Sequence, residues 1–582
     1  MDNMGEDIMN GNMLAEIKNY MSNYKRNVIE FADGWRDIPM PCLTEGLFGI
    51  FEQSGSRLEY EKVYFTRRKY LASFGILSIM DGKKEDIQKL EEVILDICKE
   101  EFWGLPAHVN RDANPNWRLS IDLFAAETAG ALAEIITVLD GELSKKVKDE
   151  VRENVFKRVL NPFYGSNPPY SSWEYSEHNW CAVCSGSIGI ASIYLLREEP
   201  DKLNQYLERI CNSLSHYIDG FLDDGACMEG LSYFTYGMTY YVSFAALMYE
   251  YSNGKVDLLN NEKCAKIASF QQKCYFKGGR SISFSDGNSR EHFKMGLTAK
   301  LALTYKNVSI PNMNQVALFD FDSAYRWSAI YRDYIWVNEY VDKIESDTLD
   351  IKQNDQIVLP FSQWSICQSE NNIGMAVKGG NNDEPHNHND IGNFLYVNGH
   401  DMLITDLGAG EYTKAYFGAG RYEILCNSSF GHNVPIINEK PQIYGKEYKS
   451  SIFNTDGWGN TTIEFSGAYE RGDLTSLVRD MDFNRMSGEL IVTDTFIIND
   501  NTTSIKENLV TEYEPVIDNN EIRIYGEKTG CSIIVDEGVD SIEVITANHS
   551  NHDGKLVKVY LIRIDVPIRS GEVRVKLIIR PI

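Results

Sequence analysis

Three residues of one short segment are of the types that bind a metal ion or move a proton. The stretch HNHNDIGNF places His386, His388 and Asp390 at every second position, directly before the apolar run 394–397. An alternating β-strand would send all three side chains to one face. Imidazole and carboxylate groups are zinc ligands, and histidine is also a common general acid or base. Because the chain has only ten histidines, two of them beside a carboxylate indicate a site.

The chain that follows can bring further ligands to this segment. The dipeptide NG at 398–399 lies between apolar runs, a pattern that predicts a β-hairpin. Its return strand would carry Asp406 back toward His388, opposite residues 391–393. His432, in NSSFGHNVPI, could join them from a neighbouring strand. Two imidazoles and one carboxylate form a zinc ligand set. The alternative is that these polar residues lie at the surface or only form hydrogen bonds.

A second group of candidate residues lies in the first half of the chain. The stretch WEYSEHNW contains His178, Asn179 and Trp180, and DDGACMEGLSYFTYGMTYYV contains Glu229, Tyr233 and Tyr236. Aromatic rings beside amides and histidines are typical of sugar-binding clefts. Tyrosines three or four residues apart more often pack a helix. However, glycines before Tyr233 place it near a loop–helix junction, where a phenol can be exposed.

The elements that must position these residues change in character along the chain. Up to about residue 340, segments such as 87–103 and 139–160 have apolar residues at three- and four-residue spacing, which predicts helices. After about residue 350, short runs of Ile, Val, Tyr and Thr alternate with turns, which predicts a β-sandwich. The boundary is expected in VDKIESDTLDIKQNDQ. We predict an α+β protein of two domains: an incomplete (α/α) toroid over 1–345 and an antiparallel β-sandwich over 355–582.

Composition limits the partners and the compartment. A net charge of −27 argues against nucleic acid or an anionic membrane as the partner. It allows a small acidic substrate, because local cations such as Arg118 and Arg421 can outweigh a screened global field. The N-terminal segment lacks the features of a signal peptide, and no apolar run reaches about 18 residues. Eleven scattered cysteines suit a reducing compartment. We therefore expect a cytoplasmic protein and leave open a homo-oligomer.

The motifs together resemble one enzyme family. The pattern HNHNDIGNF, LITDLGAGEYT and RYEILCNSSFGHN is similar to the C-terminal domain of heparinase II/III-like polysaccharide lyases. The pattern HNW, followed by DG, EG and YF.YG, resembles their catalytic helical domain. The resemblance covers nearly the whole chain in the expected order. It implies a toroid followed by a β-sandwich, and cleavage of acidic glycans by β-elimination.

The resemblance also implies roles for individual residues. Tyr233 falls on the catalytic tyrosine and His386 on a catalytic histidine. His178 and Asn179 fall on the pair beside the substrate carboxylate, although some members place the asparagine first. Structural zinc ligands are implied at His388, Asp406 and His432. We further expect five residues to contact the substrate: Trp180, Glu229, Tyr236, Arg118 and Arg421.

The chemistry of a uronic-acid lyase explains these residue types. The enzyme removes the C5 proton beside the carboxylate and expels the C4 oxygen. Hydrogen bonds to the carboxylate stabilise the enolate-like intermediate, while Tyr233 and His386 transfer protons. The expected substrate is a glycosaminoglycan of the heparan, chondroitin or hyaluronan type, or alternatively alginate. Two further alternatives are a glycan-binding protein without activity and a glycoside hydrolase that uses Asp223, Asp224 and Glu229.

Overall fold

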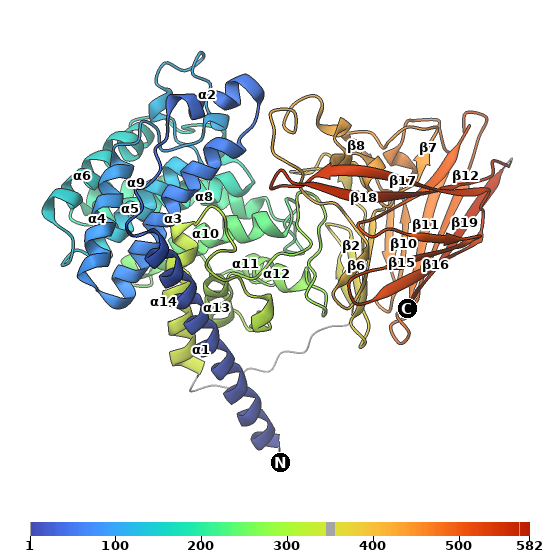
Figure 1. Cartoon of the computed structure of the whole chain (residues 1–582), viewed down its shortest axis with the longest axis horizontal. Coiled ribbons are helices and arrows are strands. Elements are labelled where there is room, and N and C mark those ends of the chain that lie inside the picture. The colour runs from blue at the N-terminus through green and yellow to red at the C-terminus, as the bar shows by residue number, and fades with distance from the viewer. Residues whose placement is uncertain (1, 345–355, 570) are drawn as a thin grey trace. The chain divides into compact units, whose positions relative to one another are not determined.

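The computed structural model describes residues 2–344, 356–569 and 571–582 (Figure 1). Most of the predicted domain boundary, 345–355, lies outside the described residues. The chain folds into two compact units. The helical unit comprises Met1–Phe221, Phe234–Ser269 and His292–Ile351, and the strand unit comprises Leu222–Tyr233, Phe270–Glu291 and Lys352–Ile582. The strand unit therefore includes two segments that lie within the limits predicted for the helical domain.

The first half of the chain folds into helices that pack in pairs. Their bounds are α1 (Asp2–Trp35), α2 (Glu45–Ser54), α3 (Leu58–Asp81), α4 (Lys84–Cys98), α5 (Leu123–Val138), α6 (Lys145–Val155), α7 (Asn161–Tyr164), α8 (Asn179–Leu195), α9 (Pro200–Asp219), α10 (Leu231–Tyr251), α11 (Glu262–Ala268), α12 (Phe270–Lys273), α13 (Met295–Thr304) and α14 (Trp327–Ile344). Helix α3 packs on α4, α8 packs on both α5 and α9, and α13 packs on α14.

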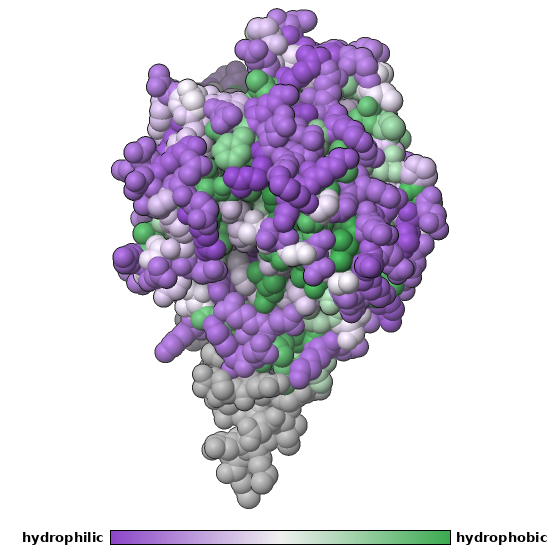
Figure 2. All heavy atoms as spheres, turned by 90° about the vertical axis from the view of Figure 1, so that its left-hand side faces the viewer, coloured by the Kyte–Doolittle hydropathy of each residue, from purple (hydrophilic) through white to green (hydrophobic). Residues whose placement is uncertain are grey.

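Burial follows the apolar pattern of each helix. Helix α9 buries Leu203, Leu207, Ile210 and Leu214, which lie three or four residues apart on one face. Helices α5 and α8 are buried on nearly all sides, because their apolar residues are not confined to one stripe. None of the described helices combines the length and the hydrophobicity needed to cross a bilayer. The face in Figure 2 is largely hydrophilic, with hydrophobic residues in small groups among polar ones.

The strand unit consists of antiparallel sheets. The first has the order β1 (Gln356–Leu359), β2 (Trp364–Gln368), β3 (Ile373–Lys378), β5 (Phe394–Asn398), β6 (Asp401–Ile404). The largest has the order β14 (Val516–Asp518), β15 (Glu521–Tyr525), β16 (Gly530–Glu537), β19 (Glu572–Pro581), β12 (Leu490–Ile497), β11 (Ser476–Phe483), β10 (Asn460–Glu464), β9 (Ile452–Thr455).

Two smaller sheets complete the strand unit. One has the order β17 (Ser541–Ser550), β18 (Leu556–Asp565), β13 (Ile505–Thr511), β7 (Ile436–Ile437), and the other pairs β4 (Asn381–Asn382) with β8 (Gly445–Lys449). One apolar core includes residues of the five-, eight- and four-stranded sheets, among them Phe394, Leu477 and Ile562. An incomplete (α/α) toroid followed by an antiparallel β-sandwich is thus the architecture, as predicted.

Candidate functional site

The segment with His386, His388 and Asp390 is a loop, so the prediction that it forms an alternating strand is wrong. Strand β4 ends before these residues and β5 begins after them. His386 has a left-handed backbone, with φ of 56°, which a strand does not allow. Asp390 forms an ion pair with the buried Lys378, whose Nζ lies 2.7 Å from Oδ1. Buried hydrogen-bond partners, and not a neighbouring strand, therefore fix these side chains.

A hairpin brings Asp406, one of the predicted metal ligands, to the segment after His388, and a later segment brings His432. Asn398 pairs with Asp401, so the turn consists of Gly399 and His400 and lies one residue later than predicted. The return strand carries Asp406 back to Asn393, whose Nδ2 donates to Oδ2 at 2.6 Å. His388, Asp406 and His432 are buried, and one ligand atom from each lies within 4.8 Å of the others.

The hydrogen bonds of the two histidines suit a metal site. His432 Nε2 bonds the Cys426 carbonyl at 2.8 Å, which leaves Nδ1 facing Asp406 at 3.2 Å. His388 Nε2 bonds Asp286 at 2.9 Å, and its buried Nδ1 has no hydrogen-bond partner among the described residues. Metal-bound histidines commonly donate their second ring N–H to a carbonyl or carboxylate in this way. Burial lowers the pKa of His388, which favours the neutral, ligating form.

Buried polar residues of the sandwich hold the metal-ligand segments in place. Asn433, next to His432, donates to the carbonyls of Phe394 and Thr405 at 2.8 and 2.7 Å. Arg479 donates to the carbonyls of Gly392 and Asn433 at 2.8 and 2.7 Å. These bonds connect the start of β5, the end of β6 and the His432 segment. The segments that carry Asp406 and His432 are therefore anchored through their backbones.

Asp286 is the central acceptor of the site. Its Oδ2 lies 2.6 Å from His386 Nδ1 and accepts a hydrogen bond from the Tyr412 hydroxyl at 2.9 Å. Its Oδ1 lies 2.9 Å from His388 Nε2 and accepts a short hydrogen bond from Tyr416. One buried carboxylate thus connects the candidate catalytic histidine to a candidate metal ligand.

The surroundings of Asp286 keep it ionised. Burial alone would raise the pKa of this carboxyl, but hydrogen bonds from His386 and His388 hold it well below its ordinary value. Burial, together with the charge of Asp286, raises the pKa of Tyr412 well above that of a free tyrosine. The stable arrangement is therefore a carboxylate surrounded by protonated donors.

Tyr233 lies in the first turn of α10, after Gly230, whose φ is 98°. Its ring stacks on that of His386, with 4.1 Å between the centroids and 23° between the planes. Its hydroxyl forms a short hydrogen bond with the hydroxyl of Tyr412. Glu229 Oε1 lies 3.5 Å from His386 Nε2, the ring nitrogen that does not face Asp286. The strand unit thus brings together Tyr233, His386 and Glu229.

Arg421 holds the backbone of this site. Its Nε and Nη2 lie 3.2 and 2.9 Å from the Asn387 carbonyl, and Nη1 lies 3.2 Å from that of Tyr416. The guanidinium also lies over the Tyr416 ring at 4.6 Å. Only 13% of the side chain is exposed. These contacts favour a structural role for this arginine over the predicted substrate contact.

The remaining predicted site residues lie in the helical unit. His178 is the N-cap residue of α8, Asn179 is the buried first residue of that helix, and the ring of Trp180 lies 4.9 Å from that of His108. Arg118 is half-exposed and donates to Glu101 at 2.7 Å. The structure therefore places Arg118 in a surface ion pair.

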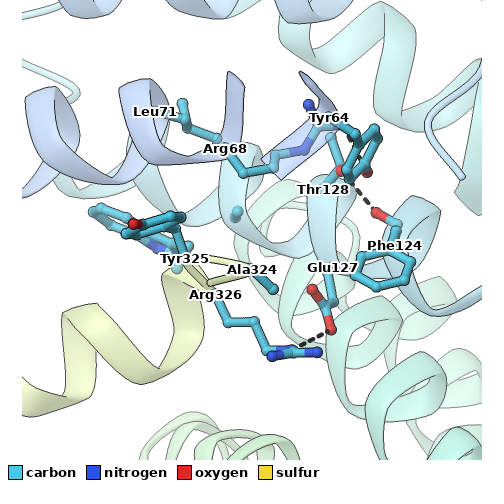
Figure 3. Close-up of a pocket in the computed structure, with 11 residues that line it drawn as sticks. Tyr64, Arg68, Leu71, Phe124, Glu127, Thr128, Ala324, Tyr325 and Arg326 are labelled. Carbon is cyan, nitrogen blue, oxygen red and sulfur yellow. Dashed lines mark hydrogen bonds and ion pairs between the residues drawn. The ribbon is translucent and has the colours of Figure 1, made fainter. Parts of the chain in front are cut away.

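Tyr236 belongs to a partly buried polar cluster of the helical unit. Its hydroxyl donates to Glu127, and the Arg326 guanidinium covers its ring at 4.0 Å. Figure 3 shows Glu127 and Arg326 on the wall of a small cavity of about 20 Å³. Such a cavity has room for about one water molecule and not for a sugar ring. Burial raises the pKa of Glu127 to about 7, despite the opposing effect of Arg326.

The sequence alone did not indicate Asp286, Tyr412 or Tyr416. Asp286 lies in SFSDGNSR, 100 residues before His386, and no local spacing connects the two. The tyrosines lie in GEYTKAYFG, directly after the hairpin that carries Asp406. The available signals were their density there and the position of Tyr412 in the motif LITDLGAGEYT.

Comparison with known proteins gives matches of fold. A crystal structure of heparinase III is similar over 98% of this chain and 92% of its own, with 13% identity and a TM-score of 0.61. A mutant heparan sulfate lyase from Pedobacter heparinus matches over 100% and 90%, with 10% identity and a TM-score of 0.59. Another heparinase III matches over 98% and 91%, with 11% identity and a TM-score of 0.59. No protein-family model and no curated protein sequence matches the chain.

Proposed function

We propose that the protein is a lyase that cleaves uronic-acid-containing glycans by β-elimination. The observation that carries the proposal is the stacked pair of Tyr233 and His386 beside the buried Asp286 carboxylate. A tyrosine and a histidine in contact supply two groups that can exchange protons with C5 and with the C4 oxygen. Full-length likeness in fold to heparan sulfate lyases supports the same reaction class.

Asp286 sets the tautomer of the neutral histidine in this proposal. Because the carboxylate accepts from His386 Nδ1, the neutral imidazole has its lone pair at Nε2. We assign Nε2 and the Tyr233 hydroxyl to proton transfer. His178 and Asn179 keep the role that the resemblance implies, hydrogen bonding to the substrate carboxylate, which stabilises the charge that develops as the C5 proton leaves.

A zinc ion fits the buried cluster, and we propose His388, Asp406 and His432 as its ligands. The fit rests on the Nδ1 of His388, which has no hydrogen-bond partner in the described part of the chain, and on the hydrogen bonds that the second ring nitrogen of each histidine makes. A bound cation would neutralise the local carboxylate charge and fix the hairpin. Its proposed contribution is structural, since Tyr233 and His386 already account for the proton transfers.

The glycoside hydrolase alternative has less support. It needs two carboxyl groups free to act on either side of the scissile bond. Asp224 accepts hydrogen bonds from the backbone N–H groups of Phe361 and Ser362, both at 2.9 Å. Asp224 therefore stabilises a turn. Among the described residues, Glu229 is the one of the three candidates whose carboxylate lies near His386.

The substrate class is tested directly with a panel of heparan-, chondroitin-, hyaluronan- and alginate-type oligosaccharides. Elimination creates an ultraviolet-absorbing double bond and products whose masses sum to that of the substrate. Hydrolysis adds one water and gives no chromophore, and a glycan-binding protein gives saturable binding without product. We propose imported oligosaccharides in a cytoplasmic setting, since each of the eleven cysteines is a free thiol.

A further inference from the structure

The hydroxyl of Tyr412 lies between two groups of the site. It bonds the Asp286 Oδ2 at 2.9 Å on one side and the Tyr233 hydroxyl on the other. A tyrosine hydroxyl carries one proton and can donate only one hydrogen bond. The direction of these two bonds therefore decides which of the two tyrosines has a proton to give.

Asp286 fixes that direction. The carboxylate receives His386 Nδ1, His388 Nε2 and the Tyr416 hydroxyl, so it acts as an acceptor throughout. Tyr412 must then donate its proton to Oδ2. Its oxygen is left as the acceptor for Tyr233, which consequently is held as a protonated phenol.

We propose that Tyr412 is a positioning residue that holds Tyr233 as the proton donor to the C4 leaving oxygen and leaves the C5 proton to His386. This inference rests on the function proposed above. In the step, the C5–H electron pair forms the C4–C5 double bond and the C4–O bond breaks. The leaving oxygen takes the Tyr233 proton, and His386 Nε2 takes the C5 proton. His386 gains one proton and Tyr233 loses one, so proton exchange with water restores the site.

Tyr416 provides a matched control. It donates to the same carboxylate, at Oδ1, and its ring lies 4.9 Å from that of Tyr412. In the described structure, its hydroxyl donates to Asp286 and accepts a hydrogen bond from the backbone N–H of Gly410. Tyr416→Phe thus removes one donor from Asp286, as Tyr412→Phe does, without removing the acceptor of Tyr233.

The test compares two uronate substrates that differ only in the group at C4. One releases a sugar alkoxide from C4, which needs a proton on departure. The other has a 4-nitrophenyl ether at C4 and releases 4-nitrophenolate, which does not. Tyr412→Phe should lower kcat on the sugar substrate about tenfold or more, the worth of one hydrogen bond, with little change in KM. The aryl substrate should recover most of this loss. Tyr233→Phe should show the same pattern, whereas His386→Ala should be slow on both.

The opposite results are equally clear. If the kcat of Tyr412→Phe falls by the same factor on both substrates, the inference is overturned and the lyase function stands. The same holds if the kinetics of Tyr412→Phe match those of Tyr416→Phe. Wild-type protein inactive on both substrates overturns the proposed function. A resting-state measurement separates the two cases, because ring-labelled tyrosine NMR should show the Tyr233 signal shifted by Tyr412→Phe and unmoved by Tyr416→Phe. An unmoved Tyr233 signal in Tyr412→Phe overturns the inference whatever the activity.

Discussion

The imidazole of His386 lies flat against the ring of Tyr233, at 4.1 Å between centroids. Each ring therefore packs against the other and helps to fix its position. A substitution that removes a whole ring alters both groups, whereas one that removes only a hydroxyl leaves the stack in place. Tests of the site should accordingly use the smallest possible changes.

Tyr233→Phe should abolish elimination and preserve the fold. The substitution deletes the proton-carrying oxygen but keeps the ring on His386, so the rate should fall roughly 100- to 10,000-fold. Steady-state absorbance assays and thermal melting provide the measurement. Tyr236→Phe, which deletes a hydroxyl held by Glu127, is the comparison. A nearly inactive Tyr236→Phe beside an active Tyr233→Phe would show that we chose the wrong tyrosine.

His388→Ala should remove a bound zinc ion and lower the melting temperature and the activity together. The reason is that the three ligands come from the His386 loop, the end of β6 and the His432 segment, which a metal would cross-link. Metal analysis should give nearly one zinc per parent chain and little in the variant. His400→Ala, in the exposed hairpin turn, should keep its metal. Metal-free parent protein with full stability and activity would contradict the assignment.

Arg421→Ala should destabilise the site without changing how binding depends on salt. Its guanidinium holds two backbone carbonyls, and losing such charged hydrogen bonds costs about 2–3 kcal/mol. Arg421→Lys should restore little, because an ammonium cannot reproduce the planar fork. Denaturant unfolding and KM at two ionic strengths distinguish the roles. A raised, salt-sensitive KM with normal stability would instead identify a substrate contact.

The partly buried Glu127 predicts a pH dependence of stability in the helical unit. Burial raises its pKa to about 7 from 4.5, so the folded state holds this proton more tightly than the unfolded chain. The stability that the protonated Glu127 adds to the folded state is complete below pH 4.5 and is lost as the pH rises through 7. Each unit of difference between the folded and unfolded pKa corresponds to about 1.4 kcal/mol. Unfolding free energies measured across this range should decline less in Glu127→Gln. An identical slope in both proteins would show that Glu127 is ionised throughout.

The order of helices and strands could be predicted because each element carries its own period. Helix α9 shows its buried face at three- and four-residue spacing, and the hairpin of β5 and β6 is signalled by its NG dipeptide. The His386 loop was misread for a physical reason. Alternating polar residues resemble a strand, yet Asp390 is held by Lys378 and His388 by Asp286.

The partners of the site residues could not be found by spacing. Asp286 and His386 are 100 residues apart and meet only because the fold returns the chain there, with Ser285 turning it at φ of 59°. The sequence predicts Arg421 as a cation that contacts the acidic substrate, although its guanidinium donates to carbonyl groups of the backbone. Local sequence identifies chemical groups, whereas their pairing depends on tertiary contacts.

The interleaving of the two units limits how this chain can be divided. A fragment of residues 352–582 would keep His386, His388, Asp406 and His432 but lose Asp286 and Tyr233, which belong to the inserted segments Phe270–Glu291 and Leu222–Tyr233. Neither the N-terminal nor the C-terminal half of the chain can thus be transferred alone with a complete site. A chimera made with a single crossover between relatives would join a histidine loop to a foreign aspartate segment. Successful recombination must exchange all three pieces of the strand unit together.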